Sequence, residues 1–531
     1  MKLEFCLVLL HILLLSPLPS TSESSDKRLR ILGAFAHPGK SHFAVFKPLL
    51  EELANRGHDV TVISYFPRSN SSPPLPNYKD IDLAGEDNIF VEVVDLQTLD
   101  YSLLREFMLL RHWGLECCQR SLDNKDVQRL IKSNAKFDLI ITEVFNSDCF
   151  LGFVHRFKAP FIGLSSHVLM PWANGRLSNE RNPSYVPILF LGYGPKMGFM
   201  ERVENYLAHK IFNFAYGVFC NGPTQKLVEE AFGPNVPALD DIAKNISAIL
   251  VNSHYSLHGA APNLPNIVEV GGLHIPEKHQ PLPADIQKFL DDASEGVVFF
   301  SWGSMIKASS MDQRTLGEVL QALGSIPWKV LWKWEDEHLP GKPDNVMVKK
   351  WVPQAAILRH PNVKCYLAHG GLLGLSEGVS AGVPMVVVPM YGDQFNNAAA
   401  ARSRGVAQVL EWNNLNGKTL KAAIDRVFND PTYMENAKAL QKVWHDRPMS
   451  PVETSVWWAE YVGRGQSNQF LRTAAADLAW YQLEHLDVIG FLLLILLVVI
   501  FAFYKALIVI FRKIFPPEKR VNGNSLSKKR N

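Results

Sequence analysis

The chain has 531 residues, of which 47% are hydrophobic and 20% are charged, and its formal net charge is +2. This length and composition predict two globular domains with ample apolar core. The near-neutral charge, without a basic stripe interleaved with aromatic residues, argues against a nucleic-acid partner.

The first 22 residues are typical of a secretory signal peptide. Lys2 precedes an apolar run from Phe5 to Leu15, and a Pro-Leu-Pro-Ser-Thr-Ser segment follows it. The run is too short for a membrane anchor. Cys6 would leave with this segment. The remaining cysteines lack regular spacing, which predicts mostly buried thiols rather than a disulfide framework or a zinc site: Cys117, Cys118, Cys149, Cys220 and Cys365.

Strands and helices alternate in the first half of the mature chain. A strand from Arg30 to Ala36, a helix from about Phe43 to Arg56 and a strand from His58 to Tyr65 form a β-α-β unit without a G-x-G-x-x-G fingerprint. Residues 69–76 are rich in Ser and Pro, which indicates a loop. Alternation of this kind indicates a parallel sheet covered by helices on both faces. Further strands are predicted at 89–94, 137–142 and 160–165.

Two histidines follow the first predicted strand, at the sheet edge where a catalytic base would be useful. His37 precedes Pro38, and His42 lies just before the predicted helix. A histidine base needs a carboxylate that fixes its tautomer and steadies the imidazolium. Glu143 and Asp148 both follow the strand predicted at residues 137–142, so either of them could supply this carboxylate.

A second α/β half begins near Gly296, after a proline-rich connection from Pro234 to Pro283. Its first strand is expected to end at Ser304 beside a glycine, which makes Ser304 a candidate phosphate contact. Two more strands, at residues 329–334 and 346–350, lead to the most informative stretch of the chain.

The stretch from Trp351 to Gln394 contains the groups that suit a nucleotide. Trp351 offers a flat face for a base, and Gln354 carries a donor and an acceptor for a base edge. A buried strand at residues 365–368, Gly370 with Gly371, and a helix from Leu372 make an anion site, to which His369 adds a donor.

Acidic and amide groups complete this stretch. Glu377 falls two turns into the helix, where its carboxylate can accept from a pair of sugar hydroxyls. Asp393 and Gln394 come just after a strand at residues 385–388, at the edge where open parallel sheets bind ligands.

The C-terminal end predicts a membrane anchor. Residues 488–511 are apolar except for Lys505 and are long enough to span a bilayer. The basic tail, residues 512–531, predicts a cytosolic end and a luminal bulk. Lys528 and Lys529, third and fourth from the end, resemble a dilysine retrieval signal of the endoplasmic reticulum. This topology makes the sequons at Asn70 and Asn245 available for N-glycosylation.

The ordered set from Trp351 to Gln394 resembles the signature of the UDP-glycosyltransferases, the membrane-bound family that includes animal UDP-glucuronosyltransferases and insect UDP-glucosyltransferases. The resemblance extends along nearly the full chain. It implies an α/β fold of the GT-B type, with two facing doubly wound Rossmann-like domains and a C-terminal transmembrane helix. The implied divisions are a signal peptide (1–22), an N-terminal acceptor-binding domain (23–283), a C-terminal UDP-sugar-binding domain (284–455), bracing helices (456–487), a transmembrane helix (488–511) and a basic tail (512–531).

The residues that bind the UDP-sugar in this family have counterparts at aligned positions of this chain. The family often has Asn at the fourth position after the histidine, but this chain has Leu373, so phosphate binding would depend on backbone N–H groups, His369 and Ser304. The resemblance implies these roles: Trp351 stacks on uracil, Gln354 bonds its edge, His369, Gly370 and Gly371 hold the phosphates, Glu377 takes the ribose, and Asp393 and Gln394 hold the sugar.

The family's catalytic residues also have counterparts. Ser41-His42-Phe43 aligns with a Ser-His-Trp run whose histidine is the general base, which favours His42 over His37. The family's supporting Asp aligns with Glu143, one methylene longer, and Asp148 remains the alternative.

The resemblance implies an inverting transfer of a hexose from a UDP-sugar to a hydroxyl of a small lipophilic acceptor, as in detoxification of phenols, with no metal or cofactor. Some glucuronate-using relatives carry an Arg-Asn-Ser run, but here Val251 precedes Asn252, which favours UDP-glucose. A UDP-glucuronate enzyme, an inactive luminal binding or oligomerising partner, and a structural single-pass protein are the alternatives. The sequence leaves homo-oligomers and hetero-oligomers open.

Overall fold

The computed structural model describes residues 27–69, 72–84, 95–98, 101–177, 181–278, 281–336, 338–465 and 468–516. The chain divides into two units, Met1–Arg472 and Thr473–Asn531. Several predictions lie outside the described residues: the signal peptide, the sequon at Asn70, the strand at residues 89–94 and the dilysine end.

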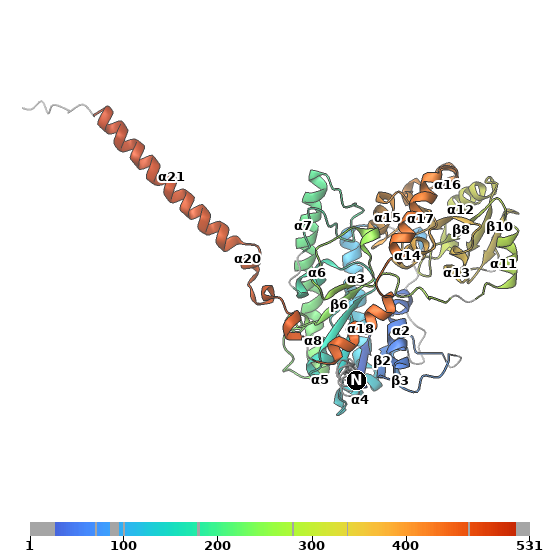
Figure 1. Ribbon diagram of the computed structural model, residues 1–531, viewed down its shortest axis with the longest axis horizontal. Helices are drawn as coiled ribbons and strands as arrows, with labels where there is room; N and C mark the ends of the chain where they lie inside the picture. Colours follow the sequence, from blue (N-terminus) through green and yellow to red (C-terminus); the bar gives the residue numbers. More distant parts are fainter. Residues whose placement is uncertain are drawn as a thin grey trace, which may run out of the picture. The chain divides into compact units, whose positions relative to one another are not determined.

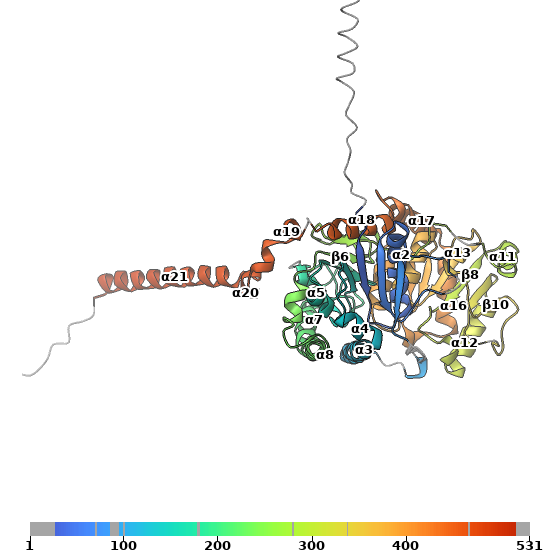
Figure 2. The same ribbon diagram turned by 90° about the horizontal axis from the view of Figure 1, so that it is seen from below.

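The first sheet of the larger unit has seven parallel strands in the order β3-β2-β1-β4-β5-β6-β7. Its central strands are buried because helices cover both faces, as Figures 1 and 2 show. The strand order reverses at β1 and β4, so the chain leaves these two neighbours in different directions and a crevice opens at their carboxyl ends. The strands are β1 Arg30–Ala34, β2 Asp59–Ser64, β3 Tyr78–Asp82, β4 Leu139–Glu143, β5 Phe161–Ser165, β6 Ala248–Val251 and β7 Ile267–Glu269.

The second sheet has six parallel strands in the order β10-β9-β8-β11-β12-β13. Its order reverses at β8 and β11, which places a second crevice beyond those two strands. The strands are β8 Val297–Ser301, β9 Lys329–Lys333, β10 Val346–Lys349, β11 Val363–Ala368, β12 Met385–Val387 and β13 Ala407–Val409.

Helices and short helical turns surround both sheets (Figure 1). Around the first sheet they are α2 Lys40–Asn55, η1 Leu96–Thr98, α3 Leu103–Asp123, α4 Lys125–Lys132, α5 Leu151–Phe157, α6 Pro171–Asn174, η2 Gly175–Leu177, α7 Phe199–Ala215, the π-helical η3 Tyr216–Asn221, α8 Gly222–Phe232, α9 Leu239–Ala243 and α10 Tyr255–His258. In the rest of this unit they are α11 Ala284–Asp291, η4 Ala308–Ser310, α12 Gln313–Gly324, α13 Gln354–Leu358, α14 Leu372–Ala381, α15 Gln394–Ser403, η5 Trp412–Asn414, α16 Gly417–Asn429, α17 Pro431–His445, α18 Pro451–Gly463 and α19 Asn468–Leu471.

Helix α18 returns to the first sheet after the second sheet is complete. Its buried residues Val456, Ala459 and Val462 join the apolar core formed by α2 and one face of that sheet. In Figure 2, α18 and α2 lie side by side on that face. Helix α18, near the end of the larger unit, therefore packs on one face of the first sheet and stabilises it.

The smaller unit contains η6 Ala474–Asp477, α20 Trp480–Leu483 and α21 Leu486–Ile514. Helix α21 has 29 residues and is, by length and composition, able to cross a membrane. The prediction of a C-terminal apolar helix is confirmed, and the helix extends beyond both predicted ends.

Three of the boundaries that differ from the sequence prediction bear on the site. Strand β4 runs to Glu143, so this carboxylate stands at the strand's last position. Strand β8 stops at Ser301, so Ser304 lies in the turn beyond the strand and not at its end. Helix α2 begins at Lys40, because Gly39 takes an extended conformation and serves as its N-cap, so His42 lies in the first helical turn.

The prediction of unbridged cysteines is wrong for Cys118 and Cys149. These two residues form a disulfide with a Cα–Cα distance of 5.5 Å, in the usual range for such bridges. Cys118 lies on α3 and Cys149 follows β4, so the fold brings together residues that their spacing did not relate. Cys220 and Cys365 are buried thiols, and Cys117 is partly buried.

We predict that the disulfide contributes substantially to stability. Replacing both Cys118 and Cys149 by Ala should lower the free energy of unfolding by roughly 3 kcal/mol, because the bridge restricts a loop of about thirty residues in the unfolded chain. Thermal unfolding measures this as a lower midpoint. Cys117→Ala is the matched control, and equal midpoints for the control and the double variant would contradict the prediction.

Candidate active site

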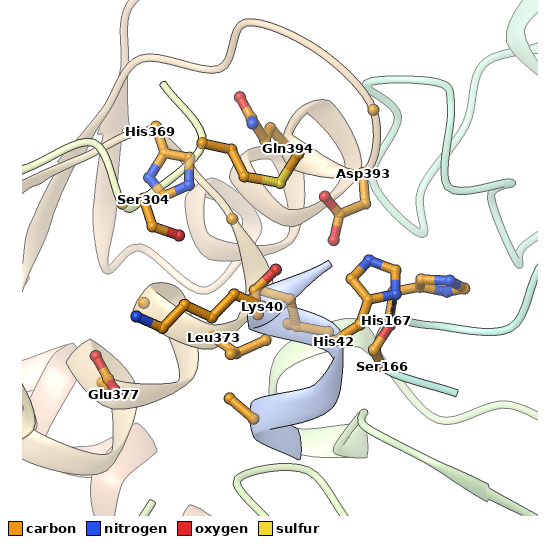
Figure 3. Close-up of a pocket in the computed structure, with 18 of the residues that line it drawn as sticks. Lys40, His42, Ser166, His167, Ser304, His369, Leu373, Glu377, Asp393 and Gln394 are labelled. Atoms are coloured by element: carbon orange, nitrogen blue, oxygen red, sulfur yellow. Dashed lines mark hydrogen bonds between the residues drawn. The ribbon is translucent and has the colours of Figure 1, made fainter. Parts of the chain in front are cut away.

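A cavity of about 610 Å³ lies between the carboxyl edges of the two sheets. Its walls come from the loops after β1 and β5, from α3, and from the loops after β8, β11 and β12. Figure 3 shows labelled residues from both halves of the chain around this space. Both strand-order reversals therefore open into one cavity.

His42 and Glu143 form a buried pair at the first sheet. The Nδ1 atom of His42 lies 2.6 Å from Oε1 of Glu143, and the two side chains are 18% and 7% exposed. They meet because β1 and β4 are adjacent parallel strands, so residues that follow their ends share one edge. No described residue bonds the other ring nitrogen of His42, Nε2, and His42 lines the cavity.

Ser166 is the third member of this group. Its Oγ lies 2.9 Å from His42 Nδ1, and its hydroxyl also hydrogen-bonds Glu143. Ser166 follows β5, the strand next to β4, so it reaches the same sheet edge. The imidazole, the carboxylate and the hydroxyl therefore lie at the carboxyl ends of three adjacent strands, the imidazole at the start of the helix that follows β1.

Burial governs the charge of this group. It lowers the pKa of His42 to about 4 and raises the pKa of Glu143 to about 7, although His37, His167 and Ser166 act to lower the latter. Near neutral pH the imidazole is thus uncharged, as a proton acceptor must be. When Glu143 is ionised it can only accept, so Nδ1 carries the ring proton and Nε2 has a free lone pair.

Two further histidines surround His42. The ring centroids of His37 and His42 are 4.6 Å apart, and those of His167 and His42 are 5.9 Å apart. His37 Nδ1 is buried without a hydrogen-bond partner among the described residues, and His167 Nδ1 donates to the carbonyl of Val168. Of the two histidines predicted as a base, only His42 contacts a carboxylate.

Asp148 is engaged elsewhere. Its Oδ1 accepts a 2.6 Å hydrogen bond from Arg176, and both side chains are buried. Asp148 does not line the cavity. Of the two predicted carboxylates, the structure therefore brings Glu143 to His42 and leaves Asp148 in a separate buried ion pair.

His369 and the start of α14 form the floor of the second half. Gly371 is the N-cap of α14, and the first backbone N–H groups of this helix have no side-chain cap. A Cβ at Gly371 would lie 2.4 Å from His369 Nε2, and one at Gly303 would lie 2.8 Å from Cε1 of the same ring. The lack of a side chain at Gly303 and Gly371 therefore allows the His369 ring to lie directly against the backbone at these two positions.

The electrostatics of this floor suit an anion. Burial lowers the pKa of His369 to about 4, with a further contribution from Lys333, so the ring is a neutral donor or acceptor. The helix N-terminus supplies positive potential and free N–H groups. Gly370 does not line the cavity; its carbonyl accepts from Asn397, which fixes the turn before α14.

Trp351, Gln354 and Glu377 lie together at one end of the cavity. The Trp351 side chain is 68% exposed and lines the open space. Gln354 Nε2 donates to Glu377 at 2.5 Å, and burial raises the pKa of Glu377 to about 7. His274, from the segment after β7, lies 3.8 Å from the same carboxylate.

Asp393 and Gln394 lie at another part of the wall, where α15 begins. Asp393 accepts from Asn397 at 2.9 Å, and burial raises the pKa of Asp393 to about 6. Gln394 accepts from the backbone N–H of Met390, which leaves its amide N–H₂ for a ligand. Glu106 of α3 lines the same region, and burial together with the charge of Asp393 raises its pKa to about 7.

The wall near His42 that belongs to the first half is mostly apolar. Phe145, Leu189 and Phe190 all line the cavity here. Other apolar residues of the first half that line it include Leu110, Trp113 and Met170.

Sequence reasoning missed several lining residues. Ser166 and His167 stand at the end of a predicted strand, and this position at a sheet edge was a usable signal. Lys40 follows the first predicted strand and Lys333 ends another strand, so the same signal applied to both; Glu106, within α3, had no such signal. Within the described ranges, no group of three or more His, Cys, Asp or Glu side chains could hold a metal ion.

The family model described as "UDP-glucoronosyl and UDP-glucosyl transferase" matches residues 36–521. The chain belongs to this family. It is therefore a UDP-glycosyltransferase, and the predicted family and enzyme class are confirmed.

Curated relatives cover almost the whole chain. A UDP-glycosyltransferase UGT5 of Dactylopius coccus is 39% identical over 89% of this chain and 90% of its own length. The UDP-glucosyltransferase 2 of the same organism is 38% identical, covering 92% and 94%. The UDP-glucuronosyltransferase 2B13 of Oryctolagus cuniculus is 31% identical, covering 90% and 93%.

Solved glycosyltransferases share the fold. The glycosyltransferase SnogD from Streptomyces nogalater has a TM-score of 0.55 and 17% identity, covering 82% of this chain and 100% of its own. A UDP-glucose: anthocyanidin 3-O-glucosyltransferase in complex with UDP has a TM-score of 0.54 and 15% identity, covering 83% and 100%. The predicted GT-B type fold, two parallel α/β sheets with their helices, is confirmed.

We predict that Asp148 matters for stability. Asp148→Asn leaves Arg176 buried without a counter-charge, which should lower the free energy of unfolding by about 3 to 5 kcal/mol. Asp148→Leu combined with Arg176→Met should recover much of this loss, because no buried charge remains. Thermal unfolding of UDP-glycosyltransferase variants tests both, with Glu143→Gln as control. An unchanged midpoint for Asp148→Asn would contradict the structural role.

Proposed function

We propose that this UDP-glycosyltransferase transfers a hexose, with inversion, from a UDP-sugar to a hydroxyl of a small lipophilic acceptor. The observation that carries the proposal is the 2.6 Å contact between His42 and Glu143 in a cavity that Trp351, His369 and Asp393 also line. A supported imidazole on one wall and an anion-binding helix start on the other are the two parts that glycosyl transfer needs.

His42 acts as the general base. With its Nδ1 proton donated to Glu143, His42 Nε2 takes the proton of the acceptor hydroxyl as the acceptor oxygen attacks the anomeric carbon. The new bond forms as the bond from that carbon to the diphosphate oxygen breaks, and the electron pair leaves with UDP. Attack opposite the leaving group converts an α-linked donor into a β-glycoside, through an oxocarbenium-like transition state.

The second half of the chain binds the donor. Trp351 stacks on uracil, Gln354 bonds its edge and Glu377 accepts from the ribose. Ser304, His369 and Gly371 surround the diphosphate, and Gly370 contributes by shaping the turn before α14. The N-terminus of α14 stabilises the negative charge of departing UDP. Asp393 and Gln394 hold the sugar hydroxyls. UDP-sugar is a co-substrate here, and the reaction draws on no further cofactor.

The donor sugar is glucose. Asp393 and Glu106 line the same region of the cavity, and a Cβ at Gly392 would lie 3.5 Å from the Glu106 carboxylate, so both acidic groups would face the sugar. A glucuronate carboxylate placed there would meet like charge, whereas glucose offers only hydroxyls. Val251, in the position where some relatives carry Arg, is buried in β6 and offers no cation.

The acceptor is lipophilic. Apolar side chains of the first half surround the approach to His42, and they favour an aromatic or aliphatic body with one hydroxyl at the base. Conjugation of phenols and similar compounds fits this wall. The acceptor-binding domain spans residues 23–283 and the donor-binding domain residues 284–455, with residues 456–487 as the brace.

The protein is a single-pass membrane protein of the endoplasmic reticulum with luminal catalytic domains. The apolar α21 provides the anchor, and the basic tail after it keeps the C-terminus in the cytosol. Asn245 is exposed at the end of α9, which suits glycosylation, and Asn70 is the second sequon. Residues 1–22 are the signal peptide.

The first test offers UDP-glucose and UDP-glucuronate side by side to membranes expressing the chain, with a panel of phenols and hydroxylated lipids. We expect glucoside, with a loss of roughly 10²- to 10⁴-fold in His42→Ala because the base is gone. His37→Ala is the matched control, since His37 lines the cavity but contacts no carboxylate.

The other outcomes separate the alternatives. Glucuronide alone would replace the donor assignment and keep the mechanism. If UDP raises the midpoint of thermal unfolding but neither donor is consumed, the chain is an inactive binding partner. If UDP does not bind, the donor site is wrong.

The rate should depend on the ionisation of Glu143. Protonated Glu143 would donate to His42 Nδ1 and leave the ring proton on Nε2, so kcat should fall as the pH drops through about 7. Glu377 and Asp393 titrate nearby, so kcat is measured at saturating donor, where a weaker donor KM has no effect. Glu143→Gln should lose this acid limb. An unchanged limb in that variant would assign the titration to another group.

A further inference from the structure

Lys40 extends from the first half of the chain into the donor part of the cavity. It is the first residue of α2, two positions before His42, and it lines the cavity together with Trp351. In Figure 3 its side chain points away from His42, toward the side on which Ser304 and Glu377 lie. Its Nζ lies 5.0 Å from the centroid of the Trp351 ring, within the range of a cation–π contact.

This ammonium group is available for another partner. Among the described residues Lys40 has no carboxylate partner, whereas the lining residue Lys333 lies 3.4 Å from Glu335. Lys40 is also exposed, so its contact with the ring is weak. A base that stacks on Trp351 can therefore replace it.

The diphosphate region offers few side-chain donors. Leu373 stands where the family often has Asn; its side chain packs against the apolar core and its carbonyl accepts from His274. The ring of His369 is uncharged near neutral pH because burial lowers its pKa to about 4. A diphosphate bound here would meet backbone N–H groups, the Ser304 hydroxyl and a neutral imidazole, none of them charged, so positive charge would have to come from a lysine.

We propose that Lys40 is a donor-binding residue supplied by the acceptor-side sheet: the base displaces its ammonium group from the Trp351 ring, and the ammonium group then pairs with the diphosphate. This inference rests on the proposed function, because it takes Trp351 as the base platform and α14 as the phosphate site. It supplies a positive charge where the chain has Leu373 in place of a polar residue.

Nucleoside and nucleotide should respond to Lys40 in opposite ways. Uridine must displace the ammonium group from the ring and offers it no phosphate in return. UDP displaces it and then pairs with it. Removing the ammonium group should therefore help uridine slightly and harm UDP.

The experiment measures binding of uridine, UMP and UDP by calorimetry to the full-length protein and its variants. Lys40→Met should weaken UDP binding by roughly tenfold, the size of one charge-assisted contact, and leave uridine binding equal or up to about threefold tighter. UMP should lie between them. Lys40→Arg should keep UDP affinity within about threefold. Lys47→Met, on the same helix but paired with Glu51, should change neither ligand.

Each result decides the matter. Weaker UDP binding with equal or tighter uridine binding supports the proposal, as does a donor KM that rises in Lys40→Met while kcat changes less. Parallel losses for both ligands would mean that Lys40 only maintains the structure, and unchanged UDP affinity would also overturn the proposal. If the unaltered protein does not bind UDP, the proposed function fails before Lys40 is tested.

Discussion

The buried contact between His42 and Glu143 is the interaction on which the chemistry of this fold depends. Burial disfavours the charged form of each group: it lowers the pKa of the imidazole to about 4 and raises the pKa of the carboxyl to about 7. A single proton on His42 Nδ1 forms the hydrogen bond that both groups need, and it leaves Nε2 free on a side chain that lines the cavity. Adjacent parallel strands β1 and β4 bring the residues together, and Ser166 after β5 completes the hydrogen bonding.

The donor side, like the base, lies at the carboxyl ends of parallel strands, where the strand order of the sheet reverses. Both sheets reverse their strand order at the centre, at β1 and β4 in one and at β8 and β11 in the other, and both crevices open into one cavity. Helix α14 then presents its N-terminus across from α2. Lys40 is the only described residue with a cation–π contact between these two walls, so nucleotide binding and the helix that carries the base share a side chain.

Sequence reasoning recovered what is local in the chain. The stretch from Trp351 to Gln394 is a continuous motif whose glycines, helix start and strand ends fix their own geometry, and the family comparison agrees with it. Contacts between distant segments were not recoverable. The bridge from Cys118 to Cys149, the ion pair of Asp148 with Arg176 and the approach of Lys40 to Trp351 each depend on how whole elements pack. For this reason the sequence favoured Glu143 only by alignment and kept Asp148 as the alternative, until the fold separated them.

A structure with UDP and a phenolic acceptor bound would show whether His42 is the base that takes the acceptor's proton. We predict that the acceptor hydroxyl lies within hydrogen-bonding distance of His42 Nε2, with Glu143 still on Nδ1 and the diphosphate at the start of α14. An acceptor hydroxyl held by another group, with His42 Nε2 turned away from it, would contradict the assignment of the base and the mechanism built on it.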